Sequence, residues 1–234
     1  MRPIWKACLF VLAGIGAAQA QNPLSPRGVV EAFLEATGGS AWEQITSLRQ
    51  EVELQMMTQG MPISGKMTMV LLYPGYMRND LVLGTPMGPM ELSQVVTPEK
   101  AWMQTPHGRQ EMPVINFAHQ VRGPRPELWM LRDTSYRFVK LERGELNGTP
   151  VHIVHVEHEG STSKLYFEVH SKLLVASEST TPQGVVWNYL RHYRKVGSVL
   201  LPHELEITVD GQSVQKLTFT KIELNIPVDK RLFQ

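Results

Sequence analysis

The stretch LRQEVELQMM, residues 48–57, decides the fold class because apolar side chains recur at every second position in it. Val52, Leu54 and Met56 are apolar, and the positions between them carry glutamate or glutamine. Successive side chains of a β-strand point to opposite faces of the sheet, so this alternation is typical of a strand with one buried face. The stretch therefore predicts a half-buried strand.

The same period of two continues after this stretch. In GKMTMVLLYP, residues 65–74, Met67, Met69 and Leu71 share one face. Short apolar segments separated by glycine and proline turns predict further strands. These lie within residues 76–84, 90–97, 100–106, 136–146, 150–160, 163–170, 173–180, 185–196, 203–211 and 214–224.

The last predicted strand has an irregular pattern. Its apolar parity switches between Phe219 and Ile222, which predicts a β-bulge or a sheet edge. The preceding Asp210-Gly211 pair is a strong hairpin signal. We therefore expect the C-terminal strands to pair in antiparallel order.

The strand within residues 185–196 carries Trp187, Tyr189, Arg191 and Tyr193 on one predicted face. Two interpretations are open for the arginine. Its guanidinium, placed among aromatic rings, suits the anchoring of a ligand. An outward row of cross-strand pairs is the favoured interpretation.

Helices are predicted at the N-terminal end of the domain. Ser25 suits the cap and Pro26 the first position of a helix that stops at Gly38 and Gly39. A second short helix is predicted for SAWEQI, residues 40–45, whose first serine and fourth-position glutamate have the spacing of a capping box.

A central insertion, residues 112–133, interrupts the strands. Val114, Phe117 and Val121 recur at helical spacing, and Pro126 suits the start of a second short helix. This second helix carries Leu128, Trp129 and Leu131. The sequence as a whole predicts one mainly β (α+β) domain of about ten antiparallel strands, with the helices as the available cover for one face.

The first twenty residues have the layout of a secretory signal peptide. Arg2 and Lys6 precede an apolar run, and Ala18-Gln19-Ala20 is a small-x-small cleavage site. We expect a cleaved signal peptide over residues 1–20 and a single exported domain over residues 21–234, with a retained anchor as the weaker alternative. The one cysteine of the chain lies in the signal, so the mature domain has no disulfide and no thiolate ligand.

The stretch HIVHVEHEG, residues 152–160, places three histidines at intervals of three residues, which suggests a zinc or copper site. In a strand, however, His152 and His158 face one side while His155 faces the other. The three imidazoles then cannot converge on one ion without a partner strand, and we predict no metal site here.

Methionine is concentrated in one part of the chain. Ten of the twelve methionines lie between Met56 and Met112. Copper binding by methionine and histidine is one alternative, but Met67 and Met69 lie in a predicted strand, and Met87 and Met90 flank a Gly-Pro turn rather than forming a repeated cluster.

Other function classes find no support. No Gly-x-Ser-x-Gly elbow, His-Glu-x-x-His helix or glycine-rich phosphate loop occurs, so we expect no catalytic residue, no cofactor and no enzyme activity. The mature chain would carry one net negative charge without a block of like charges, which gives no support to nucleic-acid binding.

Several stretches along the chain share features with a known family. They are EATGGSAWEQITSLR, YPGYMRNDLVL, AWMQTPHGRQEMP, LNGTPVHIVHVE, STSKLYFEVHSKLLVASES, YRKVGSVLLPHELEI and IELNIPVDKRLF. Together they resemble the outer-membrane lipoprotein-sorting proteins, the LolA/LolB-like superfamily of bacterial periplasmic proteins. One departure is Glu168 with Ser171-Lys172, where the family commonly has an aspartate and a Thr-Gly pair.

The resemblance implies a half-open β-barrel whose N-terminal and central helices form a lid over an apolar cavity for acyl chains. It also implies a periplasmic carrier or sensor of an acylated ligand, with a lipoprotein or lipid as partner and membrane-associated donor and acceptor proteins. We expect a monomer. A domain of the same fold with a filled core, serving structure or protein interaction, is the alternative.

Methionine side chains suit such a cavity because their flexible thioethers adapt to chains of different length. The predicted lining is Val52, Leu54, Met56, Met67, Met69, Leu71, Phe117, Leu128 and Trp129. Each of these residues also has a plain interpretation as part of a packed core.

Overall fold

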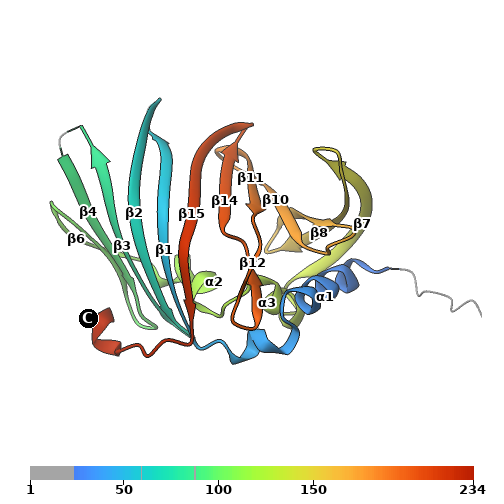
Figure 1. Cartoon of the computed structure of the whole chain (residues 1–234), viewed down its shortest axis with the longest axis horizontal. Helices are drawn as coiled ribbons and strands as arrows, with labels where there is room; N and C mark the ends of the chain where they lie inside the picture. Colours follow the sequence, from blue (N-terminus) through green and yellow to red (C-terminus); the bar gives the residue numbers. More distant parts are fainter. Residues whose placement is uncertain (1–23, 59, 87) are drawn as a thin grey trace, which may run out of the picture.

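The computed structural model of the protein describes residues 24–58, 60–86 and 88–234 (Figure 1). The predicted signal peptide, residues 1–20, and Met87 lie outside the described residues. No helix within the described part of the chain is long and apolar enough to cross a membrane.

Thirteen antiparallel strands form one curved sheet in the order β6-β5-β4-β3-β2-β1-β15-β14-β11-β10-β9-β8-β7, and β12 and β13 form a separate hairpin (Figure 1). The strands are β1 (Ser47–Thr58), β2 (Met61–Leu72), β3 (Tyr76–Thr85), β4 (Gly88–Val96), β5 (Ala101–Thr105), β6 (Gly108–Met112), β7 (Arg137–Leu146), β8 (Thr149–His158), β9 (Ser161–Glu168), β10 (Leu174–Thr181), β11 (Gly184–Arg191), β12 (Arg194–Val196), β13 (Val199–Leu201), β14 (Glu204–Val209) and β15 (Gln212–Leu224).

The mainly β, antiparallel fold is confirmed, but the barrel of about ten strands is not. The sheet stays open, with β6 and β7 as its edges. The predicted number of strands was too low partly because β6 is polar and exposed over most of its length. Its sequence therefore shows no alternation of apolar and polar side chains. The predicted strand within residues 185–196 is also divided, because His192 has a positive φ of 56° and turns the chain between β11 and β12.

The first helix, α1 (Pro26–Thr37), is capped as predicted. The amide of Gly28 donates to Ser25 Oγ at 3.0 Å, and Gly38 ends the helix with a φ of 150°. The second helix is a short 3₁₀ helix, η1 (Gly39–Gln44), capped by Gly38. The predicted capping box is wrong, because Ser40 lies inside this helix and no side-chain cap bond forms.

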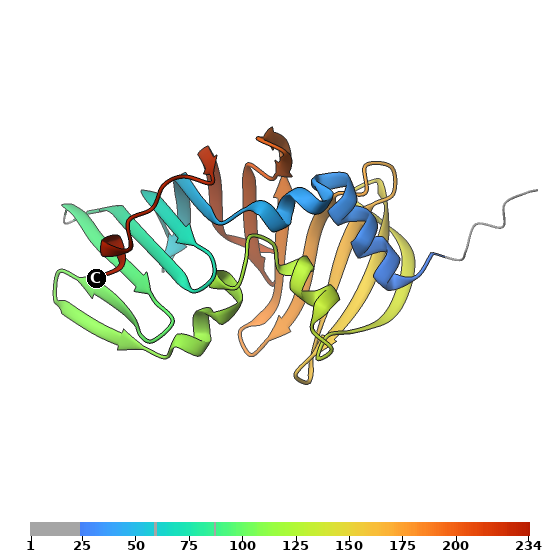
Figure 2. The ribbon, with the colours of Figure 1, turned by 90° about the horizontal axis from the view of Figure 1, so that it is seen from below.

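The central insertion is helical as predicted. It consists of η2 (Val114–Phe117), α2 (Ala118–Val121) and α3 (Pro126–Arg132), and Pro126 begins α3. The chain ends in a further 3₁₀ helix, η3 (Lys230–Phe233). Figure 2 shows α1, α2 and α3 along the same side of the sheet. We call this side the inner face and the opposite side the outer face.

Two buried clusters attach the helices to the inner face. In the first, Val30 and Phe33 of α1 pack with Val154 and Phe167 of β8 and β9. In the second, Phe117 and Val121 of the insertion pack with a group on β1 to β5. That group is Leu48, Leu71, Met77, Val96 and Ala101. On the outer face of this half, Phe233 of η3 packs with Val70, Val95 and Trp102.

The predicted irregularity in β15 is a bulge. Its register with β1 shifts between Glu51 and Val52, which lie opposite Lys221 and Phe219. The bulge restores Phe219 and Ile222 to the same face, so both strands present apolar side chains inward along their length.

One ion pair is enclosed by the helices. Arg125 and Glu127 are 6% and 5% exposed, and their Nε and Oε2 atoms lie 3.1 Å apart. The guanidinium lies 4.9 Å from the ring of Phe33 and 5.3 Å from that of Trp42. Burial raises the pKa of the neighbouring Tyr193 to about 12, while the Arg125 charge opposes the shift. The pair thus joins the insertion to α1 and η1.

Candidate functional site

The apolar side chains predicted on β1 and β2 do share the inner face. Val52 lies directly opposite Met67, and Leu48 lies opposite Leu71. Side chains of directly opposed residues in an antiparallel pair point to the same face and contact each other. We call Val52, Leu54, Met56, Met67, Met69 and Leu71 the inner stripe.

The inner stripe continues onto strands that the sequence analysis did not assign to a site. Leu81 of β3 lies opposite Met67, and Phe219 of β15 lies opposite Val52. The further members are Leu83, Met90, Leu92 and Leu217. Their own alternation was visible in the sequence, but only the pairing of β1 with β15 shows that they adjoin the stripe.

The inner stripe has two halves with different surroundings. Near the helices, Leu71 is 4% exposed and belongs to the buried cluster against which Met69 and Phe117 pack. Farther from the helices, Met56 and Met67 are only half-buried and belong to none of the buried clusters of the described residues. The first half is filled core, and the second half presents apolar side chains that none of the described helices covers.

Gly65 explains why two leucines of the second half are buried. It lies between Leu54 of β1 and Leu83 of β3. A Cβ atom at Gly65 would lie 2.9 Å from Leu83 Cδ2 and 2.5 Å from the carbonyl oxygen of Val82. Because Gly65 has no side chain, Leu54 and Leu83 can pack over the backbone of β2 at this position of the stripe.

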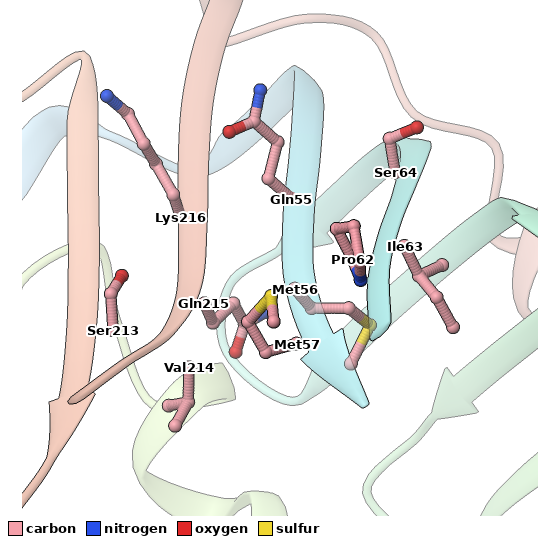
Figure 3. A pocket seen from close by; sticks show the side chains of 10 residues that line it. All are labelled: Gln55, Met56, Met57, Pro62, Ile63, Ser64, Ser213, Val214, Gln215 and Lys216. Carbon is pink, nitrogen blue, oxygen red and sulfur yellow. The ribbon is translucent and has the colours of Figure 1, made fainter. Parts of the chain in front are cut away.

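A cleft of about 690 Å³ lies at the end of the inner stripe, where β1 and β15 separate (Figure 3). The pairing of these two strands ends at Met56 and Gln215. These strand ends lie at the end of the sheet away from the helices (Figure 1). We call this the rim cleft; it is lined by Gln55, Met56, Met57, Pro62, Ile63, Ser64, Ser213, Val214, Gln215 and Lys216.

The rim cleft has an apolar wall and a polar edge. Gln55, Ser64 and Lys216 point to the same side of the sheet, as their register requires (Figure 3). The Lys216 ammonium is paired with Glu204 Oε2 at 2.9 Å. Met56 and Ile63, which lie opposite each other, line it from the inner face. An elongated apolar group with a polar end suits such a cleft, whose volume is within the range of roughly 300–1,000 Å³ that is usual for ligand pockets.

The insertion contributes less to the stripe than the sequence predicted. Phe117 packs beside Met69, but Leu128 packs in the other cluster, against α1. The Trp129 ring centroid lies 4.8 Å and 5.7 Å from the central guanidinium carbons of Arg122 and Arg132. The structure therefore does not bring Leu128 and Trp129 to the inner stripe.

The histidine stretch is a strand, β8, and its imidazoles have separate surroundings. His155 Nε2 lies 2.8 Å from Glu142 Oε2 of β7. His158 stacks on Tyr136, with ring centroids 3.9 Å apart. Among the described residues, no group of three or more histidine, cysteine, aspartate or glutamate side chains is placed to hold a metal ion.

Arg191 belongs to an outer-face network. Its Nη1 atom lies 3.2 Å from Glu204 Oε1 and 2.7 Å from Glu206 Oε2, and its guanidinium lies over Tyr189. This is the cross-strand pairing that was favoured. Tyr193 does not share this face, contrary to the sequence pattern, because the turn at His192 redirects it and its hydroxyl donates to Leu174 O at 2.8 Å.

This network predicts a pH dependence. The hydrogen bond from Arg191 holds the pKa of Glu206 below its usual value, although burial opposes it. A carboxyl group whose pKa is lower in the folded chain than in the unfolded chain stabilises the fold at pH values above its unfolded-state pKa of about 4.3. This stabilisation is lost as the pH falls through the folded-state pKa. We expect Arg191→Met to reduce the stability at pH 7 by about 0.5–1 kcal/mol and to change it less at pH 3.

Urea unfolding at the two pH values measures this difference. The exposed Arg194 provides the matched control, since Arg194→Met removes the same charge outside this network. An equal loss of stability for Arg191→Met at both pH values would contradict the assignment.

No family model matches this chain, and no curated protein matches it. Solved structures share its fold. A DUF1329 family protein from Desulfovibrio piger has a TM-score of 0.64, with 6% identity over 89% of this chain and 95% of that one. A domain from Vibrio parahaemolyticus that is assigned to outer membrane lipoprotein sorting has a TM-score of 0.61, with 12% identity over 89% and 95%.

A LolA superfamily protein from Nitrosomonas europaea is similar to the same degree, with a TM-score of 0.61 and 8% identity over 90% of this chain and 97% of that one. Identities this low show the fold alone. The resemblance to the LolA/LolB-like superfamily is therefore confirmed as a likeness of fold.

Proposed function

We propose that the protein is a non-catalytic carrier or sensor that binds an acyl chain of a lipoprotein or lipid along the inner stripe. The observation that carries the proposal is the continuity of the stripe. Its apolar side chains run from beneath the helices to the rim cleft of about 690 Å³. The shared fold with a lipoprotein-sorting domain supports the same class of ligand.

Burial of the acyl chain supplies the affinity in this proposal. Each methylene that leaves water contributes about 0.8 kcal/mol, so a chain needs no polar contact with the protein to bind. The half-buried Met56 and Met67 adapt to its path, because thioether side chains change conformation at low cost. The rim cleft is the open end through which the chain enters, and its polar edge faces the headgroup.

The proposed setting is the periplasm, reached through the signal peptide over residues 1–20. There a carrier takes its ligand from a membrane-associated donor protein and passes it to an acceptor protein. We propose that the protein acts as a monomer. The second candidate is a structural or protein-interaction domain, favoured by the filled core beneath the helices, where Leu71 and Met77 are buried.

Titration with a fluorescent fatty acid tests the proposal. We expect saturable uptake of about one probe per chain with a dissociation constant near 1 µM, which corresponds to about 8 kcal/mol and hence to roughly ten buried methylenes. Native mass spectrometry of the purified protein gives a second reading, as retained lipid adds mass. Failure to bind in both experiments would favour the interaction domain, and elemental analysis of untagged protein detects copper if that alternative is correct.

A further inference from the structure

The hairpin between β1 and β2 exposes two methionines, and the first of them lines the rim cleft. Met57, which lines the cleft, is 46% exposed, and Met61 at the hairpin turn is 53% exposed. Met77 on the next strand is 0% exposed. Exposed thioethers are unusual, because burial of methionine is normally favourable by about 1.5–3 kcal/mol. The thioethers of Met57 and Met61 are therefore accessible to solvent and to dissolved oxidants.

Thioethers react with two-electron oxidants. With hypochlorous acid, the sulfur lone pair attacks chlorine and breaks its bond to oxygen, which releases hydroxide. Water then displaces chloride from sulfur and loses two protons, one of which neutralises the hydroxide, so the products are methionine sulfoxide, a proton and chloride. Sulfur loses two electrons and chlorine gains them. The rate of oxidation rises with the solvent exposure of the thioether, and reductases specific for each sulfoxide epimer reverse the reaction. Cysteine, which would compete, is absent from the described residues.

A sulfoxide in this hairpin would also do little harm to the fold. Met57 lies opposite Pro62, and Met61 lies opposite Thr58, at the last pairs of the β1–β2 ladder. Neither side chain belongs to a buried cluster of the described residues. Oxidation there changes the polarity of the cleft while the clusters that attach the helices stay intact.

We propose that Met57 and Met61 are an oxidant-reactive pair on one hairpin, and that conversion of Met57, which lines the rim cleft, to the sulfoxide lowers the affinity of the cleft for an acyl chain. The inference rests on the proposed function and adds its regulation. The sulfoxide oxygen is a strong hydrogen-bond acceptor, so it retains water where the unmodified thioether would contact the chain. Reduction of the sulfoxide restores the apolar side chain.

The order of oxidation is the first test and needs no ligand. The folded chain is treated with a few equivalents of hypochlorite, digested with trypsin and sequenced by mass spectrometry. Met57 and Met61 fall in the peptide of residues 50–66, and Met77 falls in the peptide of residues 67–78. We expect the first two to gain oxygen well before Met77. Equal rates at Met77, or unreacted Met57 and Met61, would overturn the proposal.

The second test measures the affinity for the fluorescent fatty acid before and after oxidation. We expect about tenfold weaker binding by the oxidised protein, equivalent to the loss of roughly two buried methylenes, and recovery after treatment with both sulfoxide reductases. The double variant Met57→Leu/Met61→Leu should show the same affinity before and after oxidant. Met103→Leu, on β5, is the matched control and should keep the response.

The outcomes distinguish the two proposals. Untreated protein that does not bind the probe refutes the acyl-binding function and the switch with it. Untreated protein that binds, together with unchanged affinity after Met57 and Met61 are oxidised, refutes only the switch. The circular dichroism spectrum of the oxidised protein should match that of the untreated protein. A spectrum that shows loss of secondary structure would mean that unfolding causes the weaker binding, and would overturn the switch.

Discussion

Replacing Met67 by glutamate is expected to weaken the binding of a fluorescent fatty acid at least tenfold. Met67 lies on the inner stripe between Val52 and Leu81, in the half that the helices described by the structure leave uncovered. A carboxylate there must lose its hydration beneath the acyl chain or keep the chain away from the stripe. Burying an unpaired charge costs several kcal/mol, whereas a tenfold loss of affinity corresponds to only about 1.4 kcal/mol.

The matched control is Val82→Glu on the neighbouring strand. Val82 is exposed and lies opposite Lys66, one position along from Leu81 and hence on the outer face. The Val82→Glu substitution introduces the same charge next to the position of Leu81 but on the outer face, beside a lysine. It should change the affinity for the fatty acid by no more than about twofold. Urea unfolding of both variants checks that they fold. Equal affinities for Met67→Glu and Val82→Glu would remove the inner stripe from the binding site.

Replacing Glu127 by glutamine is expected to reduce the stability of the protein by about 3–5 kcal/mol. The substitution keeps the volume of the side chain but leaves the Arg125 guanidinium, 6% exposed, without its counter-charge. Arginine cannot lose its proton to relieve this, and the rings of Phe33 and Trp42 compensate only in part. The midpoint of urea unfolding should fall accordingly.

The double variant Arg125→Met/Glu127→Met separates a charge effect from a loss of packing. Apolar side chains of similar volume often replace a buried ion pair without loss, so the double variant should be more stable than Glu127→Gln. Glu31→Gln is the control, since it breaks the exposed Arg27–Glu31 pair and should cost less than about 1 kcal/mol. A double variant no more stable than Glu127→Gln would mean that shape, not charge, sets the loss.

Most local elements were predictable because their signals lie within a few residues. Ser25, Pro26 and Gly38 mark both ends of α1, and the alternation around Val52 marks β1. The parity of Phe219 and Ile222 predicted a bulge or a sheet edge in β15, and the structure has a bulge. Where a local signal was weak or misleading, as at Ser40 and in the polar β6, the prediction was wrong or absent.

The candidate site was predictable in part. Period two places Val52, Leu54 and Met56 on one face of β1, and the structure keeps them there. Leu128 and Trp129 were predicted in the same lining from the short helix that begins at Pro126. A helical pattern, however, does not reveal which of two neighbouring cores its apolar side meets. The turn at His192 moved Tyr193 to the other face, because one residue with positive φ reverses the direction of those that follow.

The sequence by itself determined most of the strands, the apolar face of strands such as β1, and where α1 begins and ends. Only the tertiary structure decided that β1 pairs with β15, about 170 residues along the chain, that the sheet stays open, and that Arg125 is buried between Phe33 and Trp42. The physical reason is that alternation and caps are set by neighbours in the chain. The partner of a strand is set by the packing of the whole sheet, whose apolar faces fit many pairings locally and one pairing globally.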